Sequence, residues 1–259
     1  MTSPTPSEPR TGQQLYHAPP FAPATAAKLA ALAIGTIYGV QVIVVLAQGP
    51  VLVASVAGNV AVVVLITAIA RKRGWTLADL GLRIPPARFI AAGVLVGLLM
   101  WYLTLTLVEL LSPPGDTKSL QKIVEQTSLL PTVVALAIFP AIAEELVFRG
   151  ILARGLAVRF KPLGAIALSA LVFGVYHLQP AQMVSTAVLG LALAFLTLRA
   201  DSIVPALVVH GINNTIALVL SRGELPRLNA WIDANPPIMM WASLVLVACG
   251  LGLAAKGVS

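Results

Sequence analysis

The chain has 259 residues, of which 58% are apolar and only 10% are Asp, Glu, Lys or Arg. Soluble globular domains carry about 25% charged residues, so a surface of this composition cannot face water throughout. This excludes a soluble enzyme and a nucleic-acid-binding protein, and the single cysteine, Cys249, excludes a secreted scaffold held by intrachain disulfides. The formal charge of +7 then reflects membrane topology and attraction to anionic headgroups, and it needs no acidic partner.

The charged residues are clustered and leave six long uncharged stretches, at residues 29–70, 89–108, 126–143, 162–198, 202–221 and 234–255. A helix needs about 20 residues to cross the hydrocarbon core, so four stretches fit one span each and the two longest fit a pair. Turns at Gln48 to Pro50 and at Gln179 to Gln182 divide those two. The sequence therefore predicts an all-α polytopic membrane helix bundle of about eight transmembrane helices, at 27–47, 50–70, 89–111, 128–148, 163–178, 182–198, 203–221 and 238–255.

The distribution of basic residues predicts the orientation of this bundle. An even number of spans puts both termini on one side, and 13 of the 17 basic residues fall on that side. The positive-inside rule makes it the cytoplasmic side of an integral membrane protein, in the plasma membrane if the source is prokaryotic. Residues 1–25, rich in Pro, Ser, Thr and Gln, are expected to form a disordered cytoplasmic tail, and residues 26–259 a single membrane domain. Residues 71–88 are expected to lie as a short amphipathic piece on the cytoplasmic surface.

Few ionisable side chains lie inside the predicted spans, and each needs a partner or a function because a charge at membrane depth costs at least ~2.5 kcal/mol. In the fourth span, Glu145 and Arg149 are four residues apart with the acid first, which favours an ion pair. Glu144 points about 100° away and has no cation one turn on. Pro140 lacks an N–H and is expected to open the backbone one turn before the two acids.

Two further residue pairs, each containing a histidine, share the spacing of one helical turn. Phe173 and His177 are four residues apart in the fifth span, and His210 and Asn214 in the seventh, so each pair lies on one helix face. If the three spans adjoin, both histidines and Asn214 converge on Glu144. Counted at ~1.5 Å per residue, Glu144 and His210 lie roughly 6 and 10 Å from the cytoplasmic ends of their spans. His177 lies at roughly 21 Å, too far from Glu144 for contact unless the fifth span begins in the cytoplasm or tilts.

This set of residues is compatible with more than one chemistry. A carboxylate without a fixed cation in a low-dielectric cavity is a candidate general base, and histidines and an amide beside it can orient a water or stabilise an oxyanion. Those groups suffice to hydrolyse an amide without a serine or cysteine nucleophile. Glu144, His177 and His210 are also a ligand set of the kind that binds catalytic zinc, although the His-Glu-x-x-His signature is absent. Metal use therefore stays open at this point.

Three sequence runs resemble the motifs of one family. EELVFR at 144–149, FGVYH at 173–177 and HGINN at 210–214 are similar to the EExxxR, FxxxH and HxxxN motifs of the CPBP family, which comprises type II CAAX prenyl endopeptidases and bacteriocin-processing proteins. The resemblance covers about residues 128–220 and implies an intramembrane endopeptidase with its catalytic core there. By motif position, Glu144 is similar to the glutamate that activates water. The positions that hold this water or the oxyanion are matched by His177, His210 and Asn214, and the supporting positions by Glu145, Arg149 and Phe173.

The expected substrate is a membrane-associated peptide or protein that meets the enzyme in the lipid bilayer. The resemblance leaves open whether it is prenylated, because prenylated substrates belong to the eukaryotic branch of the family. The oligomeric state is not defined by the sequence. Two alternatives come from other functional classes: a proton-coupled transporter in which Glu144 and the histidines form a relay, and a non-catalytic membrane regulator. For each intramembrane histidine, a hydrogen bond between helices is the purely structural explanation.

Overall fold

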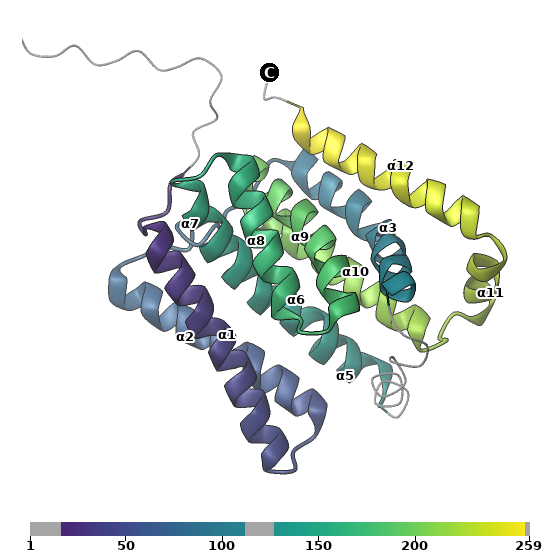
Figure 1. Ribbon diagram of the computed structural model, residues 1–259, viewed down its shortest axis with the longest axis horizontal. Coiled ribbons are helices and arrows are strands. Elements are labelled where there is room, and N and C mark those ends of the chain that lie inside the picture. The colour runs from purple at the N-terminus through teal and green to yellow at the C-terminus, as the bar shows by residue number, and fades with distance from the viewer. Residues whose placement is uncertain (1–16, 112–126, 257–259) are drawn as a thin grey trace, which may run out of the picture.

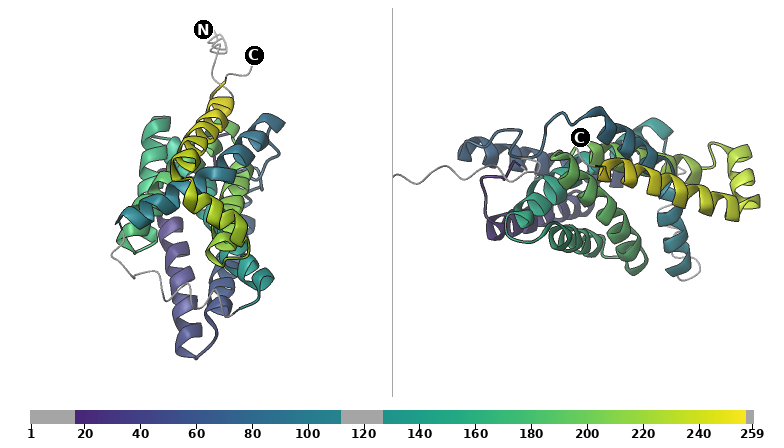
Figure 2. Two further views of the ribbon diagram at one scale, coloured as in Figure 1. Left: turned by 90° about the vertical axis from the view of Figure 1, so that its right-hand side faces the viewer. Right: turned by 90° about the horizontal axis from the view of Figure 1, so that it is seen from above.

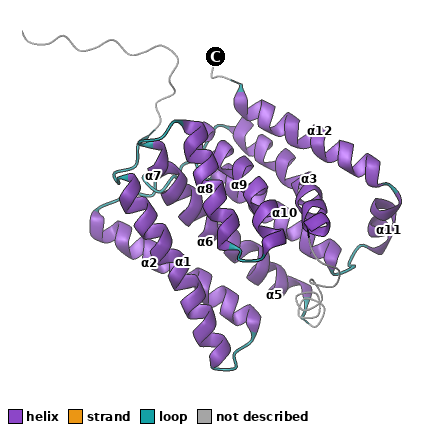
Figure 3. Ribbon diagram, in the orientation of Figure 1, coloured by secondary structure: helices purple, strands orange, loops and turns teal. Residues whose placement is uncertain are grey.

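The computed structural model describes residues 17–111 and 127–256, and within these ranges all regular structure is helical (Figure 3). Seven helices in these ranges are long and apolar enough to cross a membrane, and an eighth apolar helix is shorter. This confirms the predicted all-α polytopic bundle. Outside the fourth span the helices are α1 Pro23–Leu46, α2 Val51–Arg73, α3 Ala87–Leu111, α8 Pro162–Tyr176, α9 Pro180–Ala200, α10 Val204–Ser221, α11 Pro226–Ala234 and α12 Pro236–Ala255.

The fourth span is longer than predicted. It runs without a break from Leu129 to Ala157 through α5 Leu129–Val133, η1 Val134–Ile138, α6 Phe139–Glu145, η2 Leu146–Ala153 and α7 Arg154–Ala157. The predicted end at residue 148 was wrong because Arg149 was taken as a membrane boundary. Arg149 and Arg154 are instead buried and paired with carboxylates, so the helix carries both of them through the bundle. The two π-helical segments, η1 and η2, flank the short α-helix that carries the acids, and π-helical turns are frequent at functional sites.

The helices are arranged around this fourth span (Figures 1 and 2). α1 and α2 pack together on one side of it, α8 and α9 pack together on the other, and α3 packs against both α10 and α12 farther out. We call the side at which α1 begins and α12 ends the terminal face; it is drawn at the top of Figure 1. α7 and α9 also end there. Which side of the membrane this face occupies stays a prediction from the basic residues.

Small residues bring α3 and α10 close together. A Cβ at Gly93 would lie 2.9 Å from the Pro205 carbonyl oxygen, and one at Gly97 would lie 3.1 Å from the Val209 carbonyl oxygen. Backbones can approach this closely only where one partner has no side chain. The contact fixes the position of α10, which carries His210.

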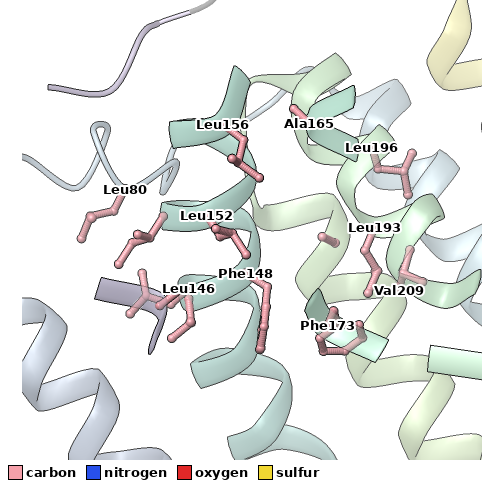
Figure 4. Close-up of a cluster of buried hydrophobic side chains, with 14 of the residues drawn as sticks. Leu80, Leu146, Phe148, Leu152, Leu156, Ala165, Phe173, Leu193, Leu196 and Val209 are labelled. Carbon is pink, nitrogen blue, oxygen red and sulfur yellow. The ribbon is translucent and has the colours of Figure 1, made fainter. Parts of the chain in front are cut away.

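The main cluster of buried apolar side chains includes residues of α1, α2 and α3 as well as of the fourth span, α8, α9 and α10, and Figure 4 shows the part of it around η2. There, side chains of η2 face those of α8, α9 and α10, with Phe148 and Phe173 in edge contact at a ring separation of 5.0 Å. The motif residues sit at one end of this layer, so dense apolar packing supports them from the terminal side. The labelled members are Leu80, Leu146, Phe148, Leu152, Leu156, Ala165, Phe173, Leu193, Leu196 and Val209.

The segment between α2 and α3 is not a surface piece along its whole length, in contrast to the expectation for residues 71–88. Leu80 is 1% exposed, and its carbonyl oxygen would lie only 2.7 Å from a Cβ at Gly150. Gly81 follows with φ of 76°, a conformation that favours glycine, and its carbonyl accepts the Ile203 N–H at 2.9 Å. The segment therefore inserts between η2 and the start of α10.

The first described residues are tied to the terminal face. The backbone N–H of His17 donates to Asp201, its carbonyl accepts from Arg154, and its ring contacts Asp79 at 2.9 Å. α1 then begins at Pro23, before the expected end of the tail at residue 25; residues 1–16 lie outside the described part of the chain. Partial burial alone raises the Asp79 pKa, but hydrogen bonds from the Thr76 backbone and hydroxyl and from His17 outweigh it and lower that pKa.

The close contact at Gly150 makes a stability prediction. Gly150→Ala forces a methyl group onto the Leu80 carbonyl, so we expect a loss of about 1 to 3 kcal/mol in unfolding free energy. Gly252→Ala in α12 is the matched control, because no atom lies within 4 Å of its added Cβ. Thermal unfolding followed by circular dichroism in detergent measures both. Equal midpoints for the two variants would contradict the inserted position of Leu80.

Candidate active site

The two acids of the first motif lie near the middle of their helix. Glu144 is 13 residues before Ala157, which places it about 20 Å from the terminal face. The expected depth of 6 Å was wrong because it was counted from residue 148. Glu144 is 6% exposed and Glu145 is fully buried, so both carboxylates lie inside the bundle.

The two histidines lie at the same depth as Glu144. His177 follows α8, 15 residues after Pro162, or about 22 Å from the terminal face. His210 is only six residues into α10, but α10 itself starts below the terminal face, because the preceding Ile203 is bonded to the inserted Gly81. The depth mismatch expected for His177 is therefore absent, and the separate spans bring the motifs to one level.

Glu145 is the centre of a buried polar network. Its Oε1 accepts from Arg149 Nη1 at 3.1 Å, which gives the ion pair that the i,i+4 spacing predicted. The same oxygen lies 2.7 Å from His210 Nδ1. Since a carboxylate oxygen accepts, His210 carries its proton on Nδ1 in this contact. Glu145 thus orients the imidazole of α10 from the fourth span.

Glu144 has a different environment from that of its neighbour. Its Oε2 lies 3.9 Å from His210 Nε2, which is too long for a direct hydrogen bond. Its Oε1 accepts from the Tyr176 hydroxyl at 3.4 Å. Among the described residues no Lys or Arg forms an ion pair with Glu144, as the spacing predicted.

Phe173 joins the rest of the site around its ring. The Arg149 guanidinium lies 4.2 Å above the ring centroid, and the rings of His177 and His210 meet it edge-on at 4.9 and 5.9 Å. His177 Nδ1 lies 2.9 Å from the Phe173 carbonyl, so this nitrogen donates and Nε2 is left as an acceptor. Phe173 is thus both core residue and spacer between the two histidines.

Asn214 lies one turn after His210 on α10 and is held by its neighbour. Asn213 Nδ2 donates to Asn214 Oδ1 at 3.0 Å, which leaves the Asn214 amide N–H groups available as donors. Among the contacts of the described residues, none joins Asn214 or His177 directly to Glu144. The structure therefore brings Glu144, Glu145, Arg149 and His210 into one contact network and places His177 and Asn214 around it.

Two tyrosines at the site were not identified from the sequence. Tyr176 lies within the second motif run and contacts Glu144, and Tyr38 of α1 donates from its hydroxyl to the Tyr176 carbonyl. A signal existed for Tyr38, because transmembrane tyrosines concentrate at the membrane interfaces and Tyr38 lies near the middle of its predicted span, whereas Tyr176 lies near the end of its own. Their partners, however, come from other helices and are not visible in a local pattern.

The side chains present do not fit a zinc site. Glu144 and His210 Nε2 provide two potential ligands, with His210 Nδ1 held by Glu145. Catalytic zinc takes three protein ligands and a water. No group of three or more His, Cys, Asp and Glu side chains in the described ranges could hold a metal ion, so the set of Glu144, His177 and His210 is not supported as a ligand set.

Two carboxylates, Glu144 and Glu145, lie beside one guanidinium, Arg149, and one imidazole, His210, in the interior of the bundle. Glu144 Oε2 and His210 Nε2 are 3.9 Å apart, a separation that allows one water to contact both groups.

Comparison with known proteins agrees with the motifs. Residues 126–216 match the family model described as type II CAAX prenyl endopeptidase Rce1-like. Searches of curated proteins and of solved structures gave no match. The matched range runs from just before α5 into α10 and contains all three motifs, whereas Tyr38 lies outside it. Over these residues the chain is similar to type II CAAX prenyl endopeptidases.

Proposed function

We propose that the protein is an intramembrane endopeptidase in which Glu144 takes a proton from the water that attacks the substrate peptide bond. One observation carries the proposal: the Glu144 carboxylate is buried, forms no direct ion pair with a Lys or Arg of the described residues, and faces His210 Nε2 at 3.9 Å. A water beside these two groups can bond to both, as is common for polar groups separated by more than 3.5 Å. The family match supports the same reaction class.

The proposed reaction needs only groups of this chain and one water. Glu144 accepts a proton as the water oxygen attacks the carbonyl carbon, and the same proton then passes to the nitrogen of the leaving amine. The Asn214 amide N–H groups donate to the oxyanion that forms on the carbonyl oxygen. The water donates one O–H to Glu144 and the other to His210 Nε2, Glu145 with Arg149 keeps His210 in place, and His177 Nε2 is a further acceptor beside them.

The proposed substrate is a membrane-associated peptide or protein. An apolar groove of about 460 Å³ runs between α8 and α9, lined by Ala170, Leu171, Val175, Met183 and Ala187 among others. One end of this groove lies near Tyr176 and His177. Val175 of the lining directly precedes them in the chain, and Met183 of the lining belongs to α9, which packs against α8. A hydrocarbon part of the substrate, prenyl or other, suits such a lining because it buries apolar surface there.

The first test removes the base and keeps its shape. Glu144→Gln is expected to lower kcat for peptide cleavage by about 10²- to 10⁴-fold, the usual contribution of a general base. Glu109→Gln in α3 is the matched control, because Glu109 is exposed on another span and is expected to leave the rate unchanged. The assay uses purified protein in vesicles with fluorogenic peptides, one with an S-farnesyl cysteine near its C-terminus and one without.

The outcome separates this function from its alternatives. Cleavage that survives Glu144→Gln would overturn the proposed role of Glu144. If neither peptide is cleaved while uptake into vesicles depends on an ion gradient, the protein is a transporter. Regulation of a partner that persists in the Glu144→Gln variant would instead favour a non-catalytic regulator.

The geometry also predicts how activity responds to metal removal. Because residues 17–111 and 127–256 provide no third ligand beside Glu144 and His210, we expect cleavage to continue at an unchanged rate after treatment with a zinc chelator. Elemental analysis of the same active sample is expected to give substoichiometric zinc. Loss of activity with chelator, restored by added zinc alone, would refute the metal-independent mechanism.

A further inference from the structure

We propose that Tyr176 and Tyr38 form a positioning pair for Glu144, in which Tyr176 fixes the carboxylate and Tyr38 of α1 fixes Tyr176. This inference rests on the proposed role of Glu144 as the base. It assigns a function at the site to a helix outside the matched range, since Tyr38 precedes residue 126 by a wide margin. Both tyrosines contact the site through a hydroxyl group, which a phenylalanine lacks.

Tyr176 gives the two carboxylate oxygens of Glu144 different hydrogen-bond environments. Its hydroxyl donates to Oε1 at 3.4 Å, while Oε2 faces His210. An oxygen that already accepts a hydrogen bond is a poorer proton acceptor than its free partner. Tyr176 therefore directs proton uptake to Oε2, on the side where His210 lies, and it stabilises the ionised carboxylate in a low-dielectric site.

The ring of Tyr176 is held by its apolar neighbours. Its centroid lies 5.2 Å from that of Phe148 and 6.5 Å from that of Phe173, the latter in a stacked arrangement. These contacts fix the plane of the ring, so the hydroxyl has little freedom to leave Glu144. The aromatic packing alone does not fix the height of Tyr176 along the bundle, because it is the last residue of α8.

Tyr38 fixes the height of Tyr176 along the bundle through a hydrogen bond to its backbone carbonyl. The last carbonyls of a helix have no partner within the helix, and an unpaired carbonyl is costly at membrane depth. The Tyr38 hydroxyl donates to the Tyr176 carbonyl, and the two rings lie 5.4 Å apart. The following Leu178 has φ of 60°, an uncommon conformation for a residue with a side chain. The hydrogen bond from α1 thus stabilises the end of α8 and the turn that follows it, in which the backbone conformation of Leu178 is unfavourable by itself.

The test compares three conservative substitutions in the full-length protein. Tyr176→Phe and Tyr38→Phe each remove one hydroxyl and keep the ring, and Tyr102→Phe is the matched control, because its hydroxyl bonds to the Pro236 carbonyl away from the site. The rate of cleavage of the farnesylated fluorogenic peptide is measured against pH, with kcat and KM determined separately. Gel filtration and helical circular dichroism check that each variant is folded.

We expect Tyr176→Phe to lower kcat about three- to ten-fold with little change in KM, as for the loss of one hydrogen bond in the transition state. The acid limb of the rate–pH profile is expected to move to higher pH, because the ionised carboxylate has lost a donor. Tyr38→Phe should change kcat and the acid limb in the same directions but by less, and Tyr102→Phe should change neither kcat nor the acid limb. A purely structural role would lower the rate without moving the acid limb.

The result that overturns this inference differs from the one that overturns the proposed function. If Glu144→Gln abolishes cleavage while both tyrosine variants keep the wild-type kcat and acid limb, the positioning pair is wrong and the general base stands. If Glu144→Gln retains cleavage, the general base is wrong. An equal effect of Tyr102→Phe and Tyr38→Phe would also refute a specific role of Tyr38.

Discussion

A buried carboxylate must be paired, and the pairing of Glu145 with Arg149 and His210 is the constraint on which this structure depends. Glu145 Oε1 accepts from Arg149 of the same span at 3.1 Å and contacts His210 of α10 at 2.7 Å, so this one oxygen joins the fourth span to α10. Removing one member of such a set leaves an uncompensated charge and typically costs about 3 to 5 kcal/mol. The network therefore fixes which helices adjoin and which way the His210 ring faces. It also separates two neighbouring acids into different roles, because Glu145 is used for structure and Glu144 keeps its oxygens for other contacts.

The rest of the fold brings the fourth span and α10 together so that Glu145 and His210 lie at one depth. Arg149 and Arg154 pass through the interior only because each has a carboxylate partner, so the fourth span extends to Ala157. The inserted turn at Leu80 and Gly81 sets the start of α10 below the terminal face. Glycines on α3 then allow α10 to approach closely. These contacts lie in different parts of the chain, and each controls the height or the direction of a motif residue.

The matched core and the surrounding helices contribute differently. Residues 126–216 contain the acids, both histidines and the asparagine, so the residues of the proposed site come from one continuous part of the chain. α1 adds Tyr38, α2 packs against α6, and α3 holds α10 in place. A polar site in a membrane needs surrounding helices that shield it from lipid, and it needs hydrogen-bond donors and acceptors at fixed positions. The outer helices provide both, since the Tyr38 hydroxyl of α1 also bonds to the Tyr176 carbonyl, which would otherwise be unpaired.

The sequence by itself determined the fold class, the positions of seven of the eight spans, the Glu145–Arg149 pair and the three motifs. Spans and i,i+4 pairs depend on local composition and spacing, which a sequence displays directly. Only the tertiary structure decided the length of the fourth span, the common depth of Glu144, His177 and His210, and the contacts of Tyr176 and Tyr38. Those depend on partners far apart in the chain: Arg149 ends a span if it faces water and continues it if Glu145 and Phe173 surround it. Charge counting cannot distinguish these cases, because the cost of a buried charge is set by what packs against it.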